Sequence, residues 1–331
     1  MRLRPPAVLT AALVSLLVLA GCAADPAPDG SADPGATAPT TEATDFPRTV
    51  EVPAGRELAA ASVTLDDEPQ RIAALTYETA ELVAELGATD RLVMVQDAMS
   101  NPVLSDHADA MAAVEHHAPT EGAIDAEQVI AAAPDLVLLS DRRGLEEGIG
   151  QVLEGAGIPV LVLPNNWASV ADMELNIGLV GQALGLDDDA AALAEEIGSG
   201  LGDASDPDGP RVLVLSNQAG QPFVTAGSAF PLEVLRLAGA QDASADLGLV
   251  RSGPITAEQV LAAEPDAILL VDMNGSGEQI FTPLLTNDAV AGLPAVAEDR
   301  VLLVEGRDVQ ALGFTSTVEG RAQIAEWLAT E

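Results

Sequence analysis

The chain contains no lysine and only one cysteine, and each scarcity excludes a class of function. With a single thiol, at Cys22, the chain cannot form an internal disulfide or a metal site built from several cysteines. Its basic residues are 14 arginines against 52 acidic residues, which gives a net charge of −38. Because nucleic acids and anionic lipids bind to basic surfaces, we predict that neither is a partner.

Motifs of common enzyme classes are also missing. The sequence has no glycine-rich phosphate loop, no Walker motif and no His-Glu-x-x-His zinc motif. Its three histidines and many carboxylates form no recognisable acid–base pair. We therefore expect no catalytic activity and no cofactor, and a secreted enzyme is a remote alternative.

The first 47 residues have the composition of a targeting signal and a spacer. Two arginines, an apolar run over 7–20 and the tetrapeptide Leu-Ala-Gly-Cys predict a signal peptide over residues 1–21. The tetrapeptide resembles a bacterial lipobox, which implies cleavage before Cys22 and lipidation of its thiol. Residues 22–47 offer little to bury and predict a disordered tether. We expect an extracytoplasmic protein anchored to the cell membrane by this lipid.

One segment of the sequence occurs twice. Residues 124–144 and 255–275 align without a gap at an offset of 131, and 13 of their 21 positions are identical. Each copy starts with a helix N-cap, Asp125 or Thr256, followed three residues later by glutamine in the capping-box position. A proline then ends the helix, and a continuous apolar run indicates a buried parallel strand. The copies predict equivalent helix–strand–loop units in two lobes.

This arrangement predicts an α/β fold with two Rossmann-like lobes and a ligand cleft between them. The N-terminal lobe is expected over 48–167 and the C-terminal lobe over 203–331. One long helix over 168–202, with a possible break at 185–187, is expected to join them. Since ligands bind beyond the carboxyl ends of parallel strands, the loop that ends each repeat copy is a candidate part of the site.

Several short motifs, in their order and spacing, resemble the substrate-binding lipoproteins of ABC importers for iron–siderophore, heme and cobalamin. The motifs are Arg71-Ile72, the helix over 79–87, Pro134 to Leu138, Gly157 to Val160, and Leu237-Ala238-Gly239. The resemblance covers about residues 68–330. It implies two lobes joined by a helix, an ABC permease with its ATPase as partners, and an iron complex as ligand. We expect a monomer without catalytic activity.

The same resemblance implies an acidic residue near the first helix of each lobe that docks on arginines of the permease. Glu81 lies six residues before Gly87, and Glu233 lies six residues before Gly239. These two glutamates are therefore the predicted docking residues.

For a ferric siderophore, the resemblance places an arginine just after the strand that follows Pro-Asp-Leu, which is Arg142 in this chain. A guanidinium suits the oxygen atoms of an anionic iron complex. Arg143 and Arg251 could extend the same basic pocket. The full set of predicted ligand contacts is Tyr77, Arg142, Arg143, Trp167, Phe223, Arg251, Met273 and Asn274.

Heme is the main alternative ligand. Heme carriers of this kind use a tyrosine or histidine as axial ligand. Tyr77, the only tyrosine, is expected in a loop at the cleft, and His116 and His117 precede the first repeat copy, also in a predicted loop. Cobalamin, which favours several aromatic side chains in the cleft, is a further alternative.

Overall fold

The structure is a computed structural model that describes residues 46–55, 58–120, 123–140, 147–164, 167–203 and 208–330. All of these belong to one compact unit, Thr44–Glu331. The predicted signal peptide, Cys22 and nearly all of the predicted tether lie outside the described residues, as do Arg142 and Arg143.

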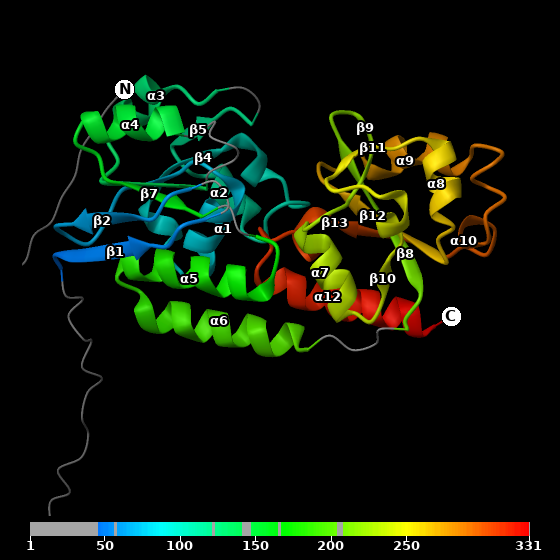
Figure 1. Cartoon of the computed structure of the whole chain (residues 1–331). Helices are drawn as coiled ribbons and strands as arrows, with labels where there is room; N and C mark the ends of the chain where they lie inside the picture. Colours follow the sequence, from blue (N-terminus) through cyan, green and yellow to red (C-terminus); the bar gives the residue numbers. More distant parts are fainter. Residues whose placement is uncertain are drawn as a thin grey trace, which may run out of the picture. The chain divides into compact units, whose positions relative to one another are not determined.

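The first lobe is built around a parallel five-stranded sheet in the order β5-β4-β3-β6-β7 (Figure 1). Its strands are β3 (Ile72–Ala74), β4 (Leu92–Gln96), β5 (His116–Ala118), β6 (Leu136–Ser140) and β7 (Val160–Leu163). The helices of the lobe are α1 (Tyr77–Glu85), α2 (Ala108–Ala112), α3 (Ala126–Ala131) and α4 (Glu147–Gly155), with short 3₁₀ turns η1 (Thr89–Arg91) and η2 (Asp97–Ser100). An antiparallel hairpin of β1 (Arg48–Val52) and β2 (Ala61–Leu65) precedes them.

The second lobe contains a mixed sheet in the order β11-β9-β8-β12-β13, with β10 also paired to β8. Its strands are β8 (Arg211–Gln218), β9 (Gln221–Val224), β10 (Gln241–Asp242), β11 (Gly253–Pro254), β12 (Ala267–Asp272) and β13 (Val301–Glu305). The other elements are α7 (Phe230–Leu237), η3 (Ala243–Leu247), α8 (Ala257–Ala263), α9 (Gly277–Leu285), α10 (Pro294–Ala297), α11 (Gly306–Val309) and α12 (Thr315–Ala329). The pairs of β8, β12 and β13 are parallel, whereas β9 is antiparallel to β8. The prediction of a two-lobed α/β fold is confirmed.

The repeat forms the same unit in both lobes: α3 and β6 in one, α8 and β12 in the other. The shared aspartate after each proline, Asp135 or Asp266, accepts a hydrogen bond from the backbone N–H of an arginine that begins the neighbouring strand. That arginine, Arg71 or Arg211, in turn donates to two carbonyls at the end of the repeat helix. In each lobe, the repeat aspartate and this arginine therefore connect the end of the repeat helix to the start of the adjacent strand, β3 or β8. The predicted capping box forms only at Thr256.

The predicted linking region contains two helices instead of one long helix, and they are separated where the sequence predicted a possible break, at 185–187. They are α5 (Val170–Leu184) and α6 (Asp187–Leu201), and they pack against each other. The chain reverses at Gly185, whose φ of 71° is a left-handed conformation that favours glycine. Gly181 allows the close packing, since a Cβ there would lie 2.2 Å from that of Ala190. Only α6 leads from the first lobe to the second (Figure 1).

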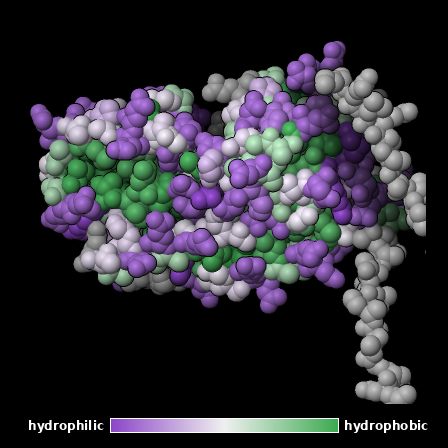
Figure 2. Space-filling view, turned by 180° about the vertical axis from the view of Figure 1, so that it is seen from behind, coloured by the Kyte–Doolittle hydropathy of each residue, from purple (hydrophilic) through white to green (hydrophobic). Residues whose placement is uncertain are grey.

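The C-terminal helix α12 completes the connection between the lobes. It packs against α6 and α7, and its side chain Arg321 donates to the carbonyl of Leu237. Seen from behind, apolar side chains gather on one face of the second lobe, and polar side chains cover much of the remaining surface (Figure 2). Within the part of the chain that the structure describes, no helix is both long and apolar enough to span a bilayer.

Candidate ligand-binding cavity

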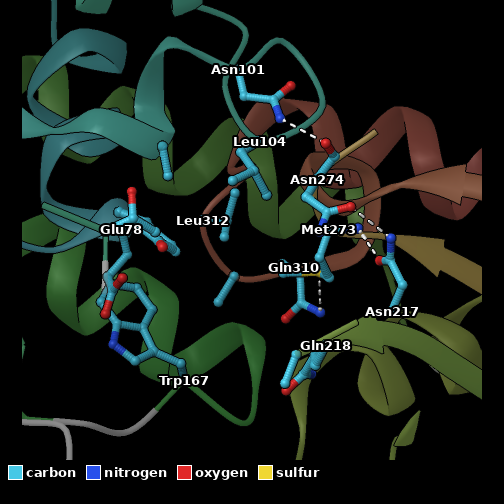
Figure 3. A pocket seen from close by; sticks show the side chains of 15 residues that line it. Glu78, Asn101, Leu104, Trp167, Asn217, Gln218, Met273, Asn274, Gln310 and Leu312 are labelled. Carbon is cyan, nitrogen blue, oxygen red and sulfur yellow. Dashed lines mark hydrogen bonds between the residues drawn. The ribbon is translucent and has the colours of Figure 1, made fainter. Parts of the chain in front are cut away.

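A cavity of about 480 Å³ is lined by residues of both lobes (Figure 3). The first lobe contributes Tyr77, Glu78, Ala98, Asn101, Leu104, Thr120 and Trp167. The second contributes Asn217, Gln218, Ala219, Met273, Asn274, Gln310, Ala311 and Leu312. Glu78 and Trp167 lie on one side of the cavity, and Asn217, Gln218 and Met273 lie on the other (Figure 3). Several of these residues follow the carboxyl ends of strands, where α/β sheets bind ligands.

Helix α1 carries the first-lobe wall. Tyr77 is its first residue, so it lies on a helix and not in the predicted loop. The helix begins there because Thr76 and Thr79 form a reciprocal capping box. Glu78 follows in the first turn and is 7 % exposed. A carboxylate at a helix N-terminus interacts favourably with the helix dipole.

Trp167 closes the same wall from the segment that follows β7. Its ring meets that of Phe314 edge-to-face, with centroids 6.2 Å apart and planes at 79°. Its indole N–H donates to the hydroxyl of Ser140, at the end of β6, over 3.4 Å. Because Phe314 is fully buried, this contact restricts the position of the indole ring.

The second-lobe wall is organised by one carboxylate, Asp272. It accepts hydrogen bonds from the side chain of Asn217 at 2.9 Å and from the backbone N–H groups of Asn274, Gly275 and Gly277 at 2.8–3.1 Å. Burial alone would raise the pKa of Asp272, but these donors together lower it below its ordinary value. Asn217 also accepts from the N–H of Met273. The loop that ends the second repeat copy is therefore held in a defined conformation.

Side-chain amides dominate the polar lining. Five of the fifteen lining residues are asparagine or glutamine, and Glu78 is the one charged residue among them. Amides provide both donors and acceptors. Several already bond one another, as in the donation from Asn101 to the carbonyl of Asn274 at 3.2 Å, which crosses between the lobes (Figure 3). The described wall is thus suited to a ligand rich in oxygen atoms.

Of the predicted ligand contacts, the structure brings Tyr77, Trp167, Met273 and Asn274 together around the cavity. Phe223 and Arg251 are not among the lining residues: Phe223 is half-buried in β9, and Arg251 is exposed in the loop before β11. That any of these residues contacts a ligand remains a prediction.

The two histidines proposed for heme belong to strand β5 and not to a loop, and neither lines the cavity. His117 interacts through Nε2 with the carbonyl of Val114 at 3.1 Å, and its Nδ1 lies 3.4 Å from a carboxylate oxygen of Asp97. These neighbours hold the ring at the edge of the first sheet. Among the predicted axial ligands, only Tyr77 is at the cavity.

The predicted docking role of Glu81 is contradicted by its burial. Its side chain is fully buried and accepts hydrogen bonds from the hydroxyl of Ser105 and the N–H of Asp106, and it lies 3.0 Å from Nδ1 of His107. The hydrogen bond with Glu81 raises the pKa of His107 above its ordinary value. Glu233 is half-buried and forms a two-pronged ion pair with Arg236 on the same helix. Neither presents a free carboxylate.

The sequence analysis missed some residues that line the cavity and two exposed glutamates. Asn217, Gln218 and Gln310 line the cavity from segments outside the repeat, so only the folded chain brings them there. Glu127 and Glu258 occupy equivalent repeat positions and are exposed in the first turns of α3 and α8. These two glutamates could have been recognised from the sequence, because they are identical in the two repeat copies.

Taken together, these features define an α/β protein whose two lobes line a common cavity. The family model for periplasmic binding proteins matches residues 72–307, and the chain belongs to this family.

Solved structures show the same fold. A periplasmic heme-binding protein, RhuT, from Roseiflexus sp. RS-1 has a TM-score of 0.68 and 22% identity, over 79% of this chain and 98% of that one. An ABC-type Fe3+-hydroxamate transport protein from Saccharomonospora viridis DSM 43017 has a TM-score of 0.67 and 24% identity, over 86% and 99%. A heme-binding protein from Pseudomonas aeruginosa has a TM-score of 0.63 and 22% identity, over 80% and 94%. No curated protein matches the chain at a significant level.

Proposed function

We propose that this protein captures an iron complex, in the first place a ferric siderophore, and delivers it to an ABC permease and its ATPase. The observation that carries the proposal is the cavity wall, in which two aromatic side chains face a row of amides. Aromatic rings suit the apolar faces of such a complex, and amides suit its oxygen atoms. The role is that of a carrier without catalysis, as for other binding proteins of this family.

The negative charge of the chain favours a neutral complex over a strongly anionic one. The whole chain carries a net charge of −38. A ferric complex of three hydroxamates is neutral, whereas one of three catecholates is strongly anionic and would be repelled. The Fe3+-hydroxamate transport protein among the similar structures supports the same choice.

Calorimetric titration with a ferric tris-hydroxamate, a ferric tris-catecholate and hemin tests this proposal. We expect the hydroxamate to bind at least about tenfold more tightly than the catecholate, equivalent to about 1.4 kcal/mol. The neutral-ligand proposal fails if the catecholate binds more tightly to the unmodified protein.

Heme is a second candidate, favoured by the position of Tyr77 at the cavity and by the heme-binding proteins among the similar structures. A phenolate oxygen could bind the ferric iron of heme as axial ligand. In the same titration, a shift of the hemin absorption band that disappears in Tyr77→Phe would replace the siderophore proposal with heme transport. The variant His116→Gln is the matched control, since that histidine lies outside the cavity lining.

For docking on the permease, we propose Glu127 and Glu258 in place of the buried Glu81. Both are exposed at equivalent positions of the two lobes, and α3 and α8 lie on the side away from α5, α6 and α12 (Figure 1). Its own backbone N–H and then the hydroxyl of Thr256 lower the pKa of Glu258, which favours its charged form. Two matched carboxylates, one for each lobe, suit a symmetric pair of arginine clusters on a partner.

Reversing both charges, as Glu127→Arg with Glu258→Arg, should abolish most ligand uptake while leaving ligand affinity unchanged. Each reversal replaces an attraction to a partner arginine with a repulsion. The measurement is uptake by vesicles that contain the permease, with Glu278→Arg as a control at an exposed glutamate outside the repeat. Normal uptake by the double variant would contradict the docking proposal.

We also propose that the protein is anchored to the outer face of the cell membrane through a lipid on Cys22. The lipobox-like tetrapeptide that ends at this residue supports the proposal. Labelled palmitate should enter the protein in cells, and Cys22→Ser should abolish the labelling. Equal labelling of both forms would rule out this anchor.

A further inference from the structure

Three side chains that can bind a metal ion meet outside the lining of the ligand cavity. Glu81 and Glu85 lie one turn apart on α1, and His107 lies beside them from the segment before α2. One ligand atom from each lies within 4.8 Å of the others. Two carboxylates and one imidazole form a suitable donor set for a divalent transition-metal ion such as zinc. We propose that Glu81, Glu85 and His107 form a metal site.

The surroundings of Glu81 resemble those of an oriented metal ligand. The hydroxyl of Ser105 and the backbone N–H of Asp106 both donate to its carboxylate. An ion between Oε1 of Glu81 and Nδ1 of His107 would replace the proton that these two atoms share at 3.0 Å. The two outer donors could remain and fix the carboxylate, which is how the outer partners of metal ligands commonly act.

One of the three proposed ligands, His107, borders a second cavity. A cavity of about 350 Å³ is lined by His107 and its neighbours Ser105, Asp106 and Ala108, and by Arg307 of the second lobe. Three protein ligands leave at least one coordination position for water in the usual geometry of zinc. The cavity gives solvent access to His107, one of the three ligands.

The cluster also lies where the two lobes touch. Glu85 accepts a hydrogen bond from the hydroxyl of Thr315 at 2.6 Å, and Asp106 pairs with Arg307 and with the hydroxyl of Ser316. These three partners belong to α11 and α12. An ion that joins α1 to the segment around His107 would therefore stabilise the part of the first lobe that contacts α11 and α12. Metal binding is expected to stabilise the whole folded unit.

Zinc titration of the full chain, carrying Cys22→Ser to remove the thiol, tests the site. Calorimetry at pH 8 should show one ion bound per chain. At a hundredfold excess over Kd, the unfolding temperature should rise by about 5 °C. Glu85→Gln and His107→Gln should each lower the affinity by more than about tenfold. Cobalt, used as a spectroscopic substitute, should give visible absorption bands that His107→Gln removes.

Matched controls separate this site from general binding to an acidic surface. His116→Gln removes a half-buried histidine of β5, and Glu127→Gln removes an exposed glutamate of α3. Neither should change zinc affinity. The unfolding temperature without metal shows that each variant is folded. Absence of zinc binding, or equal binding by Glu85→Gln, His107→Gln and the parent chain, would overturn the proposal.

Discussion

Replacing Asp272 with asparagine is expected to lower the free energy of unfolding at pH 7 by about 2–4 kcal/mol. Its carboxylate accepts four hydrogen bonds, three of them from backbone N–H groups: those of Asn274 and Gly275 in the loop and that of Gly277 at the start of α9. Hydrogen bonds to a charged group contribute about 1.5–3 kcal/mol each, and they are not additive. The amide of asparagine would also direct its own N–H groups at one of these donors. Urea unfolding at pH 7 measures the change.

The effect of Asp272→Asn should shrink in acid. Because the pKa of Asp272 in the folded protein is below its ordinary value, its carboxylate stabilises the fold above about pH 4. That contribution is lost as the pH falls through the lowered pKa, so the stabilities of parent and variant should converge below it. Glu278→Gln removes a nearby exposed carboxylate and serves as the control. If Asp272→Asn were no less stable than Glu278→Gln at pH 7, the proposed role of Asp272 would be wrong.

The second large effect is expected from Trp167→Ala, which should weaken ligand binding about 10- to 100-fold. The indole forms part of the cavity wall and rests on the buried ring of Phe314. Its removal takes away both an aromatic contact with the ligand and the surface that shapes the wall, worth together about 1.4–2.8 kcal/mol. Calorimetric titration with the tightest ligand found for the parent protein gives the affinity of the variant.

The matched control for this prediction is Trp327→Ala, which removes the other tryptophan of the chain. Trp327 is half-buried on α12 and does not line the ligand cavity. The control should cost some stability but leave the affinity unchanged. Trp167→Phe, which keeps an aromatic ring, should recover part of the lost affinity. Equal affinities for Trp167→Ala and Trp327→Ala would remove Trp167 from the binding site.

Local patterns in the sequence were enough to predict the lobes. The helix N-caps, the proline stops and the buried apolar runs act over a few residues, so they could be recognised without the tertiary structure. The repeat, with its offset of 131, showed that the unit occurs once in each half. The linker was harder to predict. The reversal at Gly185 depends on the packing of α5 against α6. That packing is close where Gly181 faces Ala190.

The surroundings of the candidate site residues could not be predicted from the sequence. Glu81 matches the spacing of a docking residue, but its face of α1 lies against the segment 105–107, which is distant in the sequence. Arg251 precedes the second repeat copy, yet the chain leaves it exposed and away from the cavity lining. The sequence indicates that a carboxylate or guanidinium is present but not which neighbours surround it.

The sequence by itself determined that this is a two-lobed α/β chain with an acidic surface and a repeated helix–strand–loop unit. These properties follow from composition and from short-range periodicity. Only the tertiary structure decided which side chains share the cavity, because Tyr77, Asn217 and Gln310 come from distant parts of the chain. It also decided that Glu81 is buried and that Glu127 and Glu258 are exposed. Such long-range packing depends on all the elements at once and leaves no local pattern to recognise.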